Sequence, residues 1–177
     1  PQLGSNMNDV MMMNPQYEVI DFNEFDILLT DIKGETIRSL VLDGCKHHSE
    51  FEKYNHSSAP TVLAGVTYGD YQRVLVKAVV AYRKALNVIM LVDTGSPYTF
   101  LTEETLKAIG VQMEDQPSDH AFVVLNGQRV KVGISKAHFK DVDVLGTNFM
   151  QFCDLHVHYP SQTAMVTVLP LVPPETS

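Results

Sequence analysis

An aspartate that follows a run of apolar residues is the first feature of this sequence that could do chemistry. Val88 to Val92 predicts a buried strand, and it leads directly into Asp93-Thr94-Gly95-Ser96. Burying an ionised carboxylate is costly, so such an aspartate needs hydrogen bonds or a second carboxylate with which to share a proton. Two aspartates held about 3 Å apart can act as acid and base on a water molecule between them.

The three residues after Asp93 suit a tight loop around its side chain. The hydroxyl of Thr94 can brace the loop, and Gly95 lets the backbone come close enough to donate a hydrogen bond to the carboxylate. Ser96 lies in no Gly-x-Ser-x-Gly motif, so it does not match the nucleophile of a serine hydrolase. The alternative interpretation of Asp93 is an ordinary turn or helix-cap residue.

Short strands must position this loop, and they predict an all-β domain. A helix is expected to start at Thr102 and to stop at Gly110, and Asn126-Gly127 predicts a tight hairpin turn. The strands expected from apolar patterning are 61–67, 72–82, 87–92, 122–125, 129–134, 142–145, 155–159 and 164–169, with a further short helix at 147–152.

These features together resemble the retropepsin-like aspartic proteases, the single-lobed relatives of pepsin. In that family two apolar residues and a glycine, followed by a short helix, cross behind the aspartate loop, and Val144-Leu145-Gly146 fits this pattern. The resemblance covers residues 61 to 170. It implies a closed acid-protease barrel lobe with one or two short helices, accompanied here by an N-terminal β-hairpin extension.

The resemblance also implies a function. The chain contains a single Asp-Thr-Gly, so a complete site requires a homodimer whose two-fold axis passes between the two Asp93 carboxylates. Such a dimer would hydrolyse a polypeptide substrate with an activated water, without a metal or other cofactor. The implied site has Asp93 as catalytic acid and base, Thr94 as a brace across the dimer, Gly95 as the contact to the carboxylate, and Ser96, Val144, Leu145 and Gly146 as support.

The spacing between the two motifs departs from the family pattern. Members usually have two hairpins there, one of them a flap that closes over the substrate, whereas this sequence shows one clear hairpin, 122–134. If that hairpin is structural, residues 111–120 remain for a flap; if it is the flap, a core strand is missing or irregular. The alternative function is therefore a catalytically silent protease-like fold that acts as a dimerisation or peptide-binding module.

The N-terminal third is expected to lie outside the protease domain. Residues 1–16 are interpreted as a flexible leader, 17–60 as an extension and linker, 61–172 as the domain and 173–177 as a tail. Within the extension, Phe25–Ile32 and Thr36–Leu42 predict a hairpin joined by Lys33-Gly34-Glu35, with a helix at Asn23–Ile32 as the alternative. Residues 17–60 could serve as a pro-region or a lid.

Composition excludes several other classes. Thirteen Lys and Arg against twenty-one Asp and Glu give a net charge of −8, which argues against nucleic acid as a partner. The apolar runs are too short to span a membrane, no secretory signal is recognised, and two cysteines argue against a disulfide framework, so a cytoplasmic protein is expected. The competing metal hypothesis would combine Cys45, His47, His48, Cys153, His156 and His158.

Overall fold

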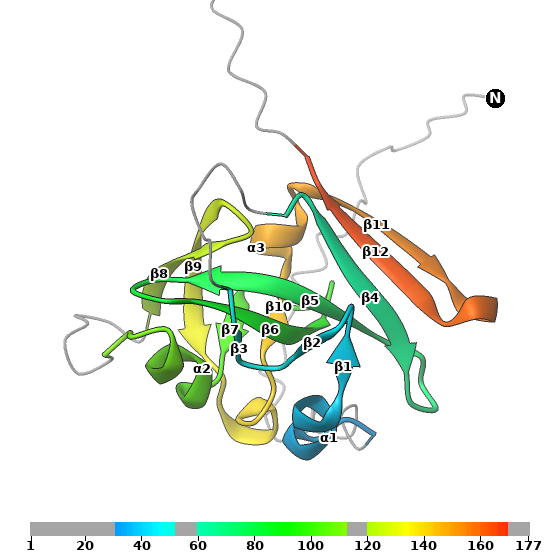
Figure 1. The fold of residues 1–177 in the computed structure, drawn as a ribbon, viewed down its shortest axis with the longest axis horizontal. Helices are drawn as coiled ribbons and strands as arrows, with labels where there is room; N and C mark the ends of the chain where they lie inside the picture. The colour runs from blue at the N-terminus through cyan, green and yellow to red at the C-terminus, as the bar shows by residue number, and fades with distance from the viewer. Residues whose placement is uncertain (1–30, 52–59, 113–119, 170–177) are drawn as a thin grey trace, which may run out of the picture.

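The structure is a computed structural model that describes residues 31–51, 60–112 and 120–169. No helix within these ranges is long and apolar enough to cross a membrane. The helices are α1 (Gly34–Ser39), α2 (Glu103–Ala108) and α3 (Thr147–Met150), with 3-10 helices η3 (Ala137–Phe139) and η4 (Tyr159–Ser161) (Figure 1). The strands are β1 (Val41–Leu42), β2 (Cys45–Lys46), β3 (Ser49–Glu50), β4 (Val62–Tyr68), β5 (Arg73–Ala81), β6 (Ala85–Val92), β7 (Thr99–Leu101), β8 (His120–Leu125), β9 (Gln128–Ile134), β10 (Val144–Leu145), β11 (Cys153–His158) and β12 (Thr163–Val168).

Six of the described strands close into a barrel. Their order is β5-β8-β9-β7-β10-β6, and β6 pairs again with β5. The short strand β10 lies between β6, to which it is parallel, and β7, to which it is antiparallel. The predicted all-β fold, a closed barrel with few short helices, is confirmed.

The hairpin β8–β9 forms part of this barrel. Its turn residues Asn126 and Gly127 have φ angles of 44° and 83°, as a two-residue turn with left-handed backbone requires. The side chain of Asn126 accepts a hydrogen bond from the Val79 N–H at 2.8 Å and donates one to the Pro60 carbonyl at 2.8 Å, which fastens the turn to β5. The predicted hairpin 122–134 is therefore structural, and the alternative in which it serves as the flap is wrong.

Beyond β5 the sheet continues outside the barrel through three strands, β4, β12 and β11. The first residues of β5 pair with β4 and its last residues pair with β8, so the two strands share one edge of β5. β12 pairs with β4 on one side and with β11 on the other. The β11–β12 hairpin projects from the barrel in orange and red in Figure 1. This element confirms the final hairpin predicted from the sequence.

Apolar side chains fill the barrel. On the paired strands β5 and β6 every second residue points inward, so that their inward rows lie side by side on the inner face of the barrel. This inner cluster includes Val76, Ala78, Val80, Val88, Met90, Leu101, Leu106, Leu125, Val130, Leu145 and Phe149.

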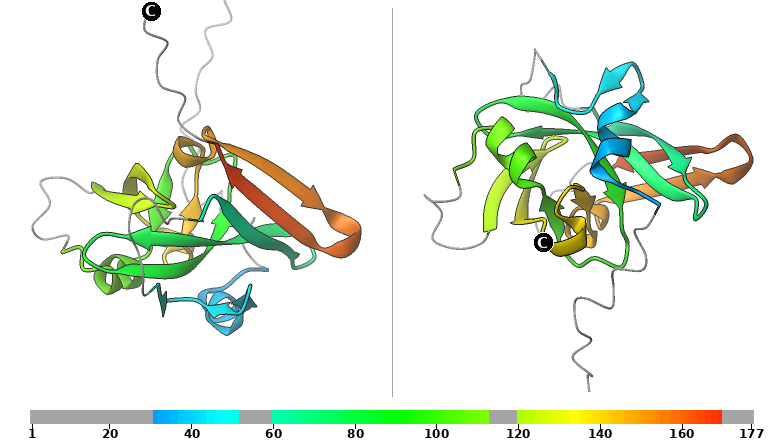
Figure 2. Two further views of the ribbon diagram at one scale, coloured as in Figure 1. Left: turned by 45° about the horizontal axis from the view of Figure 1, so that its top comes forward. Right: turned by 90° about the horizontal axis from the view of Figure 1, so that it is seen from below.

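A second apolar cluster lies on the outer face of β5 and β6. Leu75, Ile89 and Leu91 alternate with the inward residues and pack against residues 31–51, which we call the N-terminal segment. Helix α1 and strand β1 cover this face (Figure 2). Both faces of β6 are therefore buried, which explains why residues 88–92 are uniformly apolar instead of alternating. The other buried members of this cluster are Ile32, Ile37, Leu42, Val142 and Val144.

The predicted N-terminal hairpin is wrong. Residues 34–39 form helix α1, so Lys33-Gly34-Glu35 does not join two strands. Glu35 in the first turn and Arg38 in the last turn both suit the helix dipole, and Ile37 is buried against the barrel. A helix of six residues is too short to show a clear period in the sequence. The partner strand at 25–32 and the alternative helix at 23–32 lie almost entirely outside the described residues.

The N-terminal segment is joined to the barrel by strand pairing as well as by apolar contacts. Strand β3 pairs with β6 through Ser49↔Asn87 and Glu50↔Leu86. Strands β1 and β2 pair with each other around Asp43 and Gly44, which have φ angles of 48° and 71°. The predicted boundary near Pro60 and the ranges 1–16, 17–60, 61–172 and 173–177 stay predictions.

Candidate active site

The loop of Asp93 begins where strand β6 ends. The Asp93 N–H donates to the Leu145 carbonyl at 3.0 Å, so strand β10 fixes the backbone of the aspartate. The Gly95 N–H donates to Asp93 Oδ1 at 2.9 Å, and the Ser96 N–H donates to the Asp93 carbonyl at 3.2 Å. The half-buried carboxylate is thus held by its own loop.

Gly146 lies behind this loop in close contact with it. A Cβ added to Gly146 would lie 2.1 Å from the carbonyl oxygen of Tyr98, so only glycine fits there without moving the backbone. The next residue, Thr147, donates to the Ser96 carbonyl from its N–H at 2.8 Å and from its hydroxyl at 3.1 Å. The structure therefore brings together the two sequence motifs, with Val144 and Leu145 buried beneath the loop.

Thr94 and Ser96 have different surroundings. Thr94 is exposed, and within the described residues its hydroxyl makes no hydrogen bond. The Ser96 hydroxyl donates to the Tyr98 carbonyl at 2.7 Å, so it stabilises the loop. Its proton is directed at a backbone acceptor and not at a base, which agrees with the absence of a serine-hydrolase motif.

Two further residues support the loop and were missed in the sequence. The Thr99 hydroxyl accepts from the Gly146 N–H at 3.2 Å and donates to Asn148 Oδ1 at 2.8 Å. Asn148 Oδ1 also accepts from the Thr99 N–H at 2.9 Å, while its Nδ2 donates to the Lys131 carbonyl at 2.7 Å. The available signal was a polar side chain two residues after the glycine of the second motif, but that signal is weak without a spatial partner.

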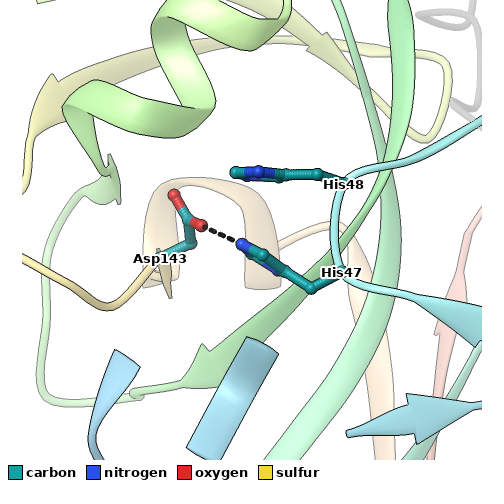
Figure 3. Close-up of side chains that lie close together, drawn as sticks. All are labelled: His47, His48 and Asp143. Atoms are coloured by element: carbon teal, nitrogen blue, oxygen red, sulfur yellow. Dashed lines mark ion pairs between the residues drawn. The ribbon is translucent and has the colours of Figure 1, made fainter. Parts of the chain in front are cut away.

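A second polar cluster lies at the start of strand β10, at the other end of the strand from Gly146. Asp143, which precedes β10, is 1% exposed and lies beside His47 and His48 of the N-terminal segment (Figure 3). His47 Nε2 lies 3.7 Å from Asp143 Oδ2, and the two imidazole rings stack with centroids 3.9 Å apart. Sequence reasoning noted the histidines but gave no reason to join them with Asp143.

The acidities in this cluster follow from burial. Burial raises the pKa of Asp143 to about 6, although hydrogen bonds from Thr102 and Thr105 act in the opposite direction. Burial also lowers the pKa of His47 to about 3, and the nearby charges of His48 and Arg38 contribute to that lowering. The distance between His47 and Asp143 fits an ion pair, but with these pKa values the two groups are not charged at the same pH.

A hydrogen bond made by His47 argues against a metal ion at the cluster. The three side chains offer ligand atoms within 4.8 Å of one another, as a metal site would need. However, His47 Nδ1 accepts the Ile89 N–H at 3.1 Å, so the proton of the neutral ring is on Nε2, the nitrogen nearest Asp143. A metal binds a deprotonated nitrogen, so a cation there would require the bond to Ile89 to break.

The metal hypothesis made from the sequence fits the structure poorly. Among the described residues, the group with metal-ligand spacing contains His47 and His48 but none of Cys45, Cys153, His156 or His158. Cys153, His156 and His158 lie along β11, on the projecting hairpin, and Cys45 lies in β2 near Lys77. The predicted combination is not assembled.

Comparison with known proteins adds a weak likeness. No family model and no curated protein matches the chain. Among solved structures, the chain is similar to a retropepsin-like aspartic protease from Rickettsia conorii, with a TM-score of 0.45 and 13% identity over 60% of this chain and 91% of that one. That identity is too low for the roles of residues to be transferred between the two proteins.

Proposed function

We propose that the chain is an aspartic endopeptidase whose active site forms across a homodimer. The observation that carries this proposal is the arrangement of Asp93: a half-buried carboxylate at the end of a barrel strand, with the Gly95 N–H on Oδ1 and with Gly146, the residue after β10, packed behind its loop. Within the described residues this carboxylate accepts one hydrogen bond, which leaves Oδ2 for a second carboxylate.

Two such loops related by a two-fold axis supply the chemistry. The two Asp93 carboxyl groups share one proton because like charges at short distance cannot both be stable. The ionised carboxylate takes a proton from water as the water oxygen attacks the peptide carbonyl, and the protonated carboxyl group donates its proton to the carbonyl oxygen. Proton transfer to the amide nitrogen then breaks the C–N bond and yields an acid and an amine.

The loop neighbours have supporting roles in this scheme. Gly95 holds one oxygen of Asp93 by its N–H, which favours a fixed orientation of the carboxylate. The exposed side chain of Thr94 is assigned the contact with the partner chain. The loop and β10 are kept in register by Ser96, Val144, Leu145 and Gly146.

One observation favours a second candidate function. The β8–β9 hairpin is part of the barrel, so the sequence between Val111 and His120 is all that remains for a flap between α2 and β8. A flap excludes water and positions the substrate, and a short one weakens catalysis. A catalytically silent module that dimerises or binds peptides is therefore the alternative.

Peptide cleavage measured together with dimer content separates these candidates. We would incubate a mixed peptide library with wild type and with Asp93→Asn across pH values of about 3.5 to 7.5, where a carboxyl dyad titrates. Asp154→Asn, a change at an exposed carboxylate on β11, serves as the matched control. Sedimentation would report the dimer content of each protein.

The proposal expects cleavage by wild type and by the control, and none by a dimeric Asp93→Asn. A folded wild-type dimer that cleaves no peptide at any pH would favour the binding module. Cleavage retained by Asp93→Asn would exclude this residue as the catalytic acid and base.

A further inference from the structure

Asp143 is a buried carboxyl group that the proposed chemistry does not use. It comes immediately before β10 and accepts two short hydrogen bonds: the Thr102 N–H donates to Oδ1 at 2.7 Å and the Thr105 hydroxyl donates to Oδ2 at 2.7 Å. Both donors belong to the start of helix α2, where Thr102 is the N-cap. The side chain of Asp143 thus ties β10 to α2.

The N-terminal segment adds a second set of contacts to the same carboxyl group. His47 places Nε2 at 3.7 Å from Asp143 Oδ2 while its Nδ1 accepts the Ile89 N–H, so one imidazole ring bridges β10 and β6. His48 Nε2 lies 2.7 Å from the Thr105 hydroxyl, and the His48 N–H donates to the Asn87 carbonyl at 2.8 Å. Figure 3 shows the histidines reaching the carboxyl group from the N-terminal segment.

The Thr105 hydroxyl lets this network accommodate a proton. When Asp143 is ionised, Thr105 donates to it and His48 Nε2–H donates to Thr105. When Asp143 is protonated, it can donate to Thr105, which then donates to His48 Nε2 with the His48 proton on Nδ1. Among the described residues, two charged groups face the network. Glu104 places Oε1 at 3.7 Å from His48 Nδ1, and Arg38 places a guanidinium nitrogen at 3.4 Å from Glu104 Oε2.

The backbone of β10 connects this network to the Asp93 loop. The Asp143 carbonyl accepts the Leu91 N–H at 2.8 Å, and two residues later the Leu145 carbonyl accepts the Asp93 N–H at 3.0 Å. Any shift of Asp143 along β10 therefore moves the acceptor that holds Asp93. Because β10 has only two residues, its side-chain anchor has a large share in fixing its position.

We propose that Asp143 is a positioning residue for Asp93, and that His47 and His48 make the N-terminal segment part of the catalytic lobe. The effect on cleavage rests on the proposed function. The effect on the geometry of the loop is independent of it and can be measured in a protein that has no activity.

Amide hydrogen exchange tests the geometric part. We would compare wild type with Asp143→Ala, Asp143→Asn and Thr105→Val, using Asp141→Ala, a change at an exposed residue nearby, as the control. Asn keeps the acceptor for Thr102 and offers Thr105 a donor, so it imitates the protonated acid. Removing both short hydrogen bonds in Asp143→Ala should speed exchange at Leu91 and Asp93 about tenfold or more relative to the amides of β8 and β9.

Asp143→Asn should restore protection at these two amides to near the wild-type level, and Thr105→Val should have an intermediate effect. The comparison with β8 and β9 corrects for any loss of global stability, because global unfolding speeds exchange at every protected amide. Equal exchange at Leu91 and Asp93 in wild type and in Asp143→Ala would overturn the proposal. So would a general acceleration that spares neither the hairpin nor the loop.

Cleavage provides the second measurement. If wild type cleaves peptides, Asp143→Ala should lower kcat at least tenfold with a smaller change in KM, whereas Asp143→Asn should retain most of kcat at low pH. If exchange changes as expected while wild type itself cleaves nothing, the positioning role stands and the proposed function fails. Unchanged kcat in an active Asp143→Ala would overturn the positioning role.

Discussion

At the scale of single residues, backbone groups hold the candidate catalytic side chain in place. One oxygen of Asp93 accepts the Gly95 N–H, and the Asp93 N–H is bound by Leu145 from the strand behind. Gly146 is needed because the Tyr98 carbonyl occupies the space where a side chain would begin. Small residues near Asp93 thus allow backbone atoms to do the positioning.

Replacing Gly146 with alanine should destabilise the fold severely. The new Cβ would lie 2.1 Å from Tyr98 O, so the loop and β10 must separate, at an expected cost of about 3 kcal/mol or more in the free energy of unfolding. Gly44→Ala is the control, since it has nothing within 4 Å but a φ of +71°, and it should cost about 1 kcal/mol. Urea unfolding measures both, and equal losses would show that close packing at Gly146 is unimportant.

The buried acid and the buried imidazole should have opposite effects on stability as pH changes. Asp143 has its pKa raised to about 6 from 3.8, so its contribution is full at low pH and is lost as pH rises through 6. His47 has its pKa lowered to about 3 from 6.5, so its contribution is present above 6.5 and is lost as pH falls through 3. Between about pH 4 and pH 6 both contributions change, and in wild type the two changes largely cancel.

Single substitutions should reveal the two opposed slopes. Relative to wild type, Asp143→Asn should gain stability as pH rises from about 4 to about 6, by roughly 1 kcal/mol per pH unit. The reason is that the change in stability from the titration of His47 is then no longer offset by that from Asp143. His47→Asn, which keeps an acceptor for the Ile89 N–H, should lose stability over the same interval. Urea unfolding at three pH values gives both slopes, and slopes of the same sign would contradict the assigned pKa shifts. His48, Glu104 and Arg38 face the pair in all three proteins.

At the scale of elements, the N-terminal segment covers the outer face of the strand that carries Asp93. Ile37 of α1 is 1% exposed and packs in the same cluster as Ile89 and Leu91 of β6. Without this cover the outer face of β6 would expose large apolar side chains to water. We therefore regard residues 31–51 as a structural part of the barrel.

Truncating Ile37 tests this role. Ile37→Ala should lower the free energy of unfolding by about 2–5 kcal/mol, because it leaves a cavity between α1 and the barrel. Val41→Ala, at a side chain in β1 that is 56% exposed, should change stability by less than about 0.5 kcal/mol. Denaturant titration compares the two, and a cost at Ile37 no larger than that at Val41 would show that α1 contributes little to the fold.

Local signals account for the elements that the sequence predicted correctly. Thr102 as N-cap, Asn126-Gly127 as a turn and the apolar strand before Asp93 each act over a few residues, and the structure has all three. Helix α1 was missed because a single short amphipathic turn resembles a short strand. The contacts of Asp143 with His47 could not be predicted, since they join residues far apart in the chain through the closure of the barrel.

At the scale of the whole molecule, one chain supplies one candidate catalytic aspartate. The sequence has a single Asp-Thr-Gly, and the closed barrel presents it once, at the end of β6. A dyad made from two identical loops requires two-fold symmetry, so each active site would contain equal contributions from two chains. The activity of a mixture of wild-type and variant chains should therefore depend on which chains pair in each dimer as well as on the amount of wild type.

Mixing wild type with Asp93→Asn tests this dependence directly. After subunit exchange at equal amounts, half of the wild-type chains are paired with a variant chain and have only one Asp93 per site. Cleavage should then fall to about half of that given by the same amount of wild type alone, and to about a tenth when the variant is in ninefold excess. The rate of peptide cleavage is the measurement, with exchange verified by energy transfer between labelled chains.

Adding Asp154→Asn in place of Asp93→Asn is the control for this experiment. That chain retains its own Asp93, so mixed dimers keep two aspartates and cleavage should increase with the added protein. If Asp93→Asn leaves wild-type cleavage unchanged although the chains exchange, each chain must contain a complete site, and the shared dyad is wrong. A fall in proportion to the mixed dimers would instead support an active site to which each chain contributes one Asp93.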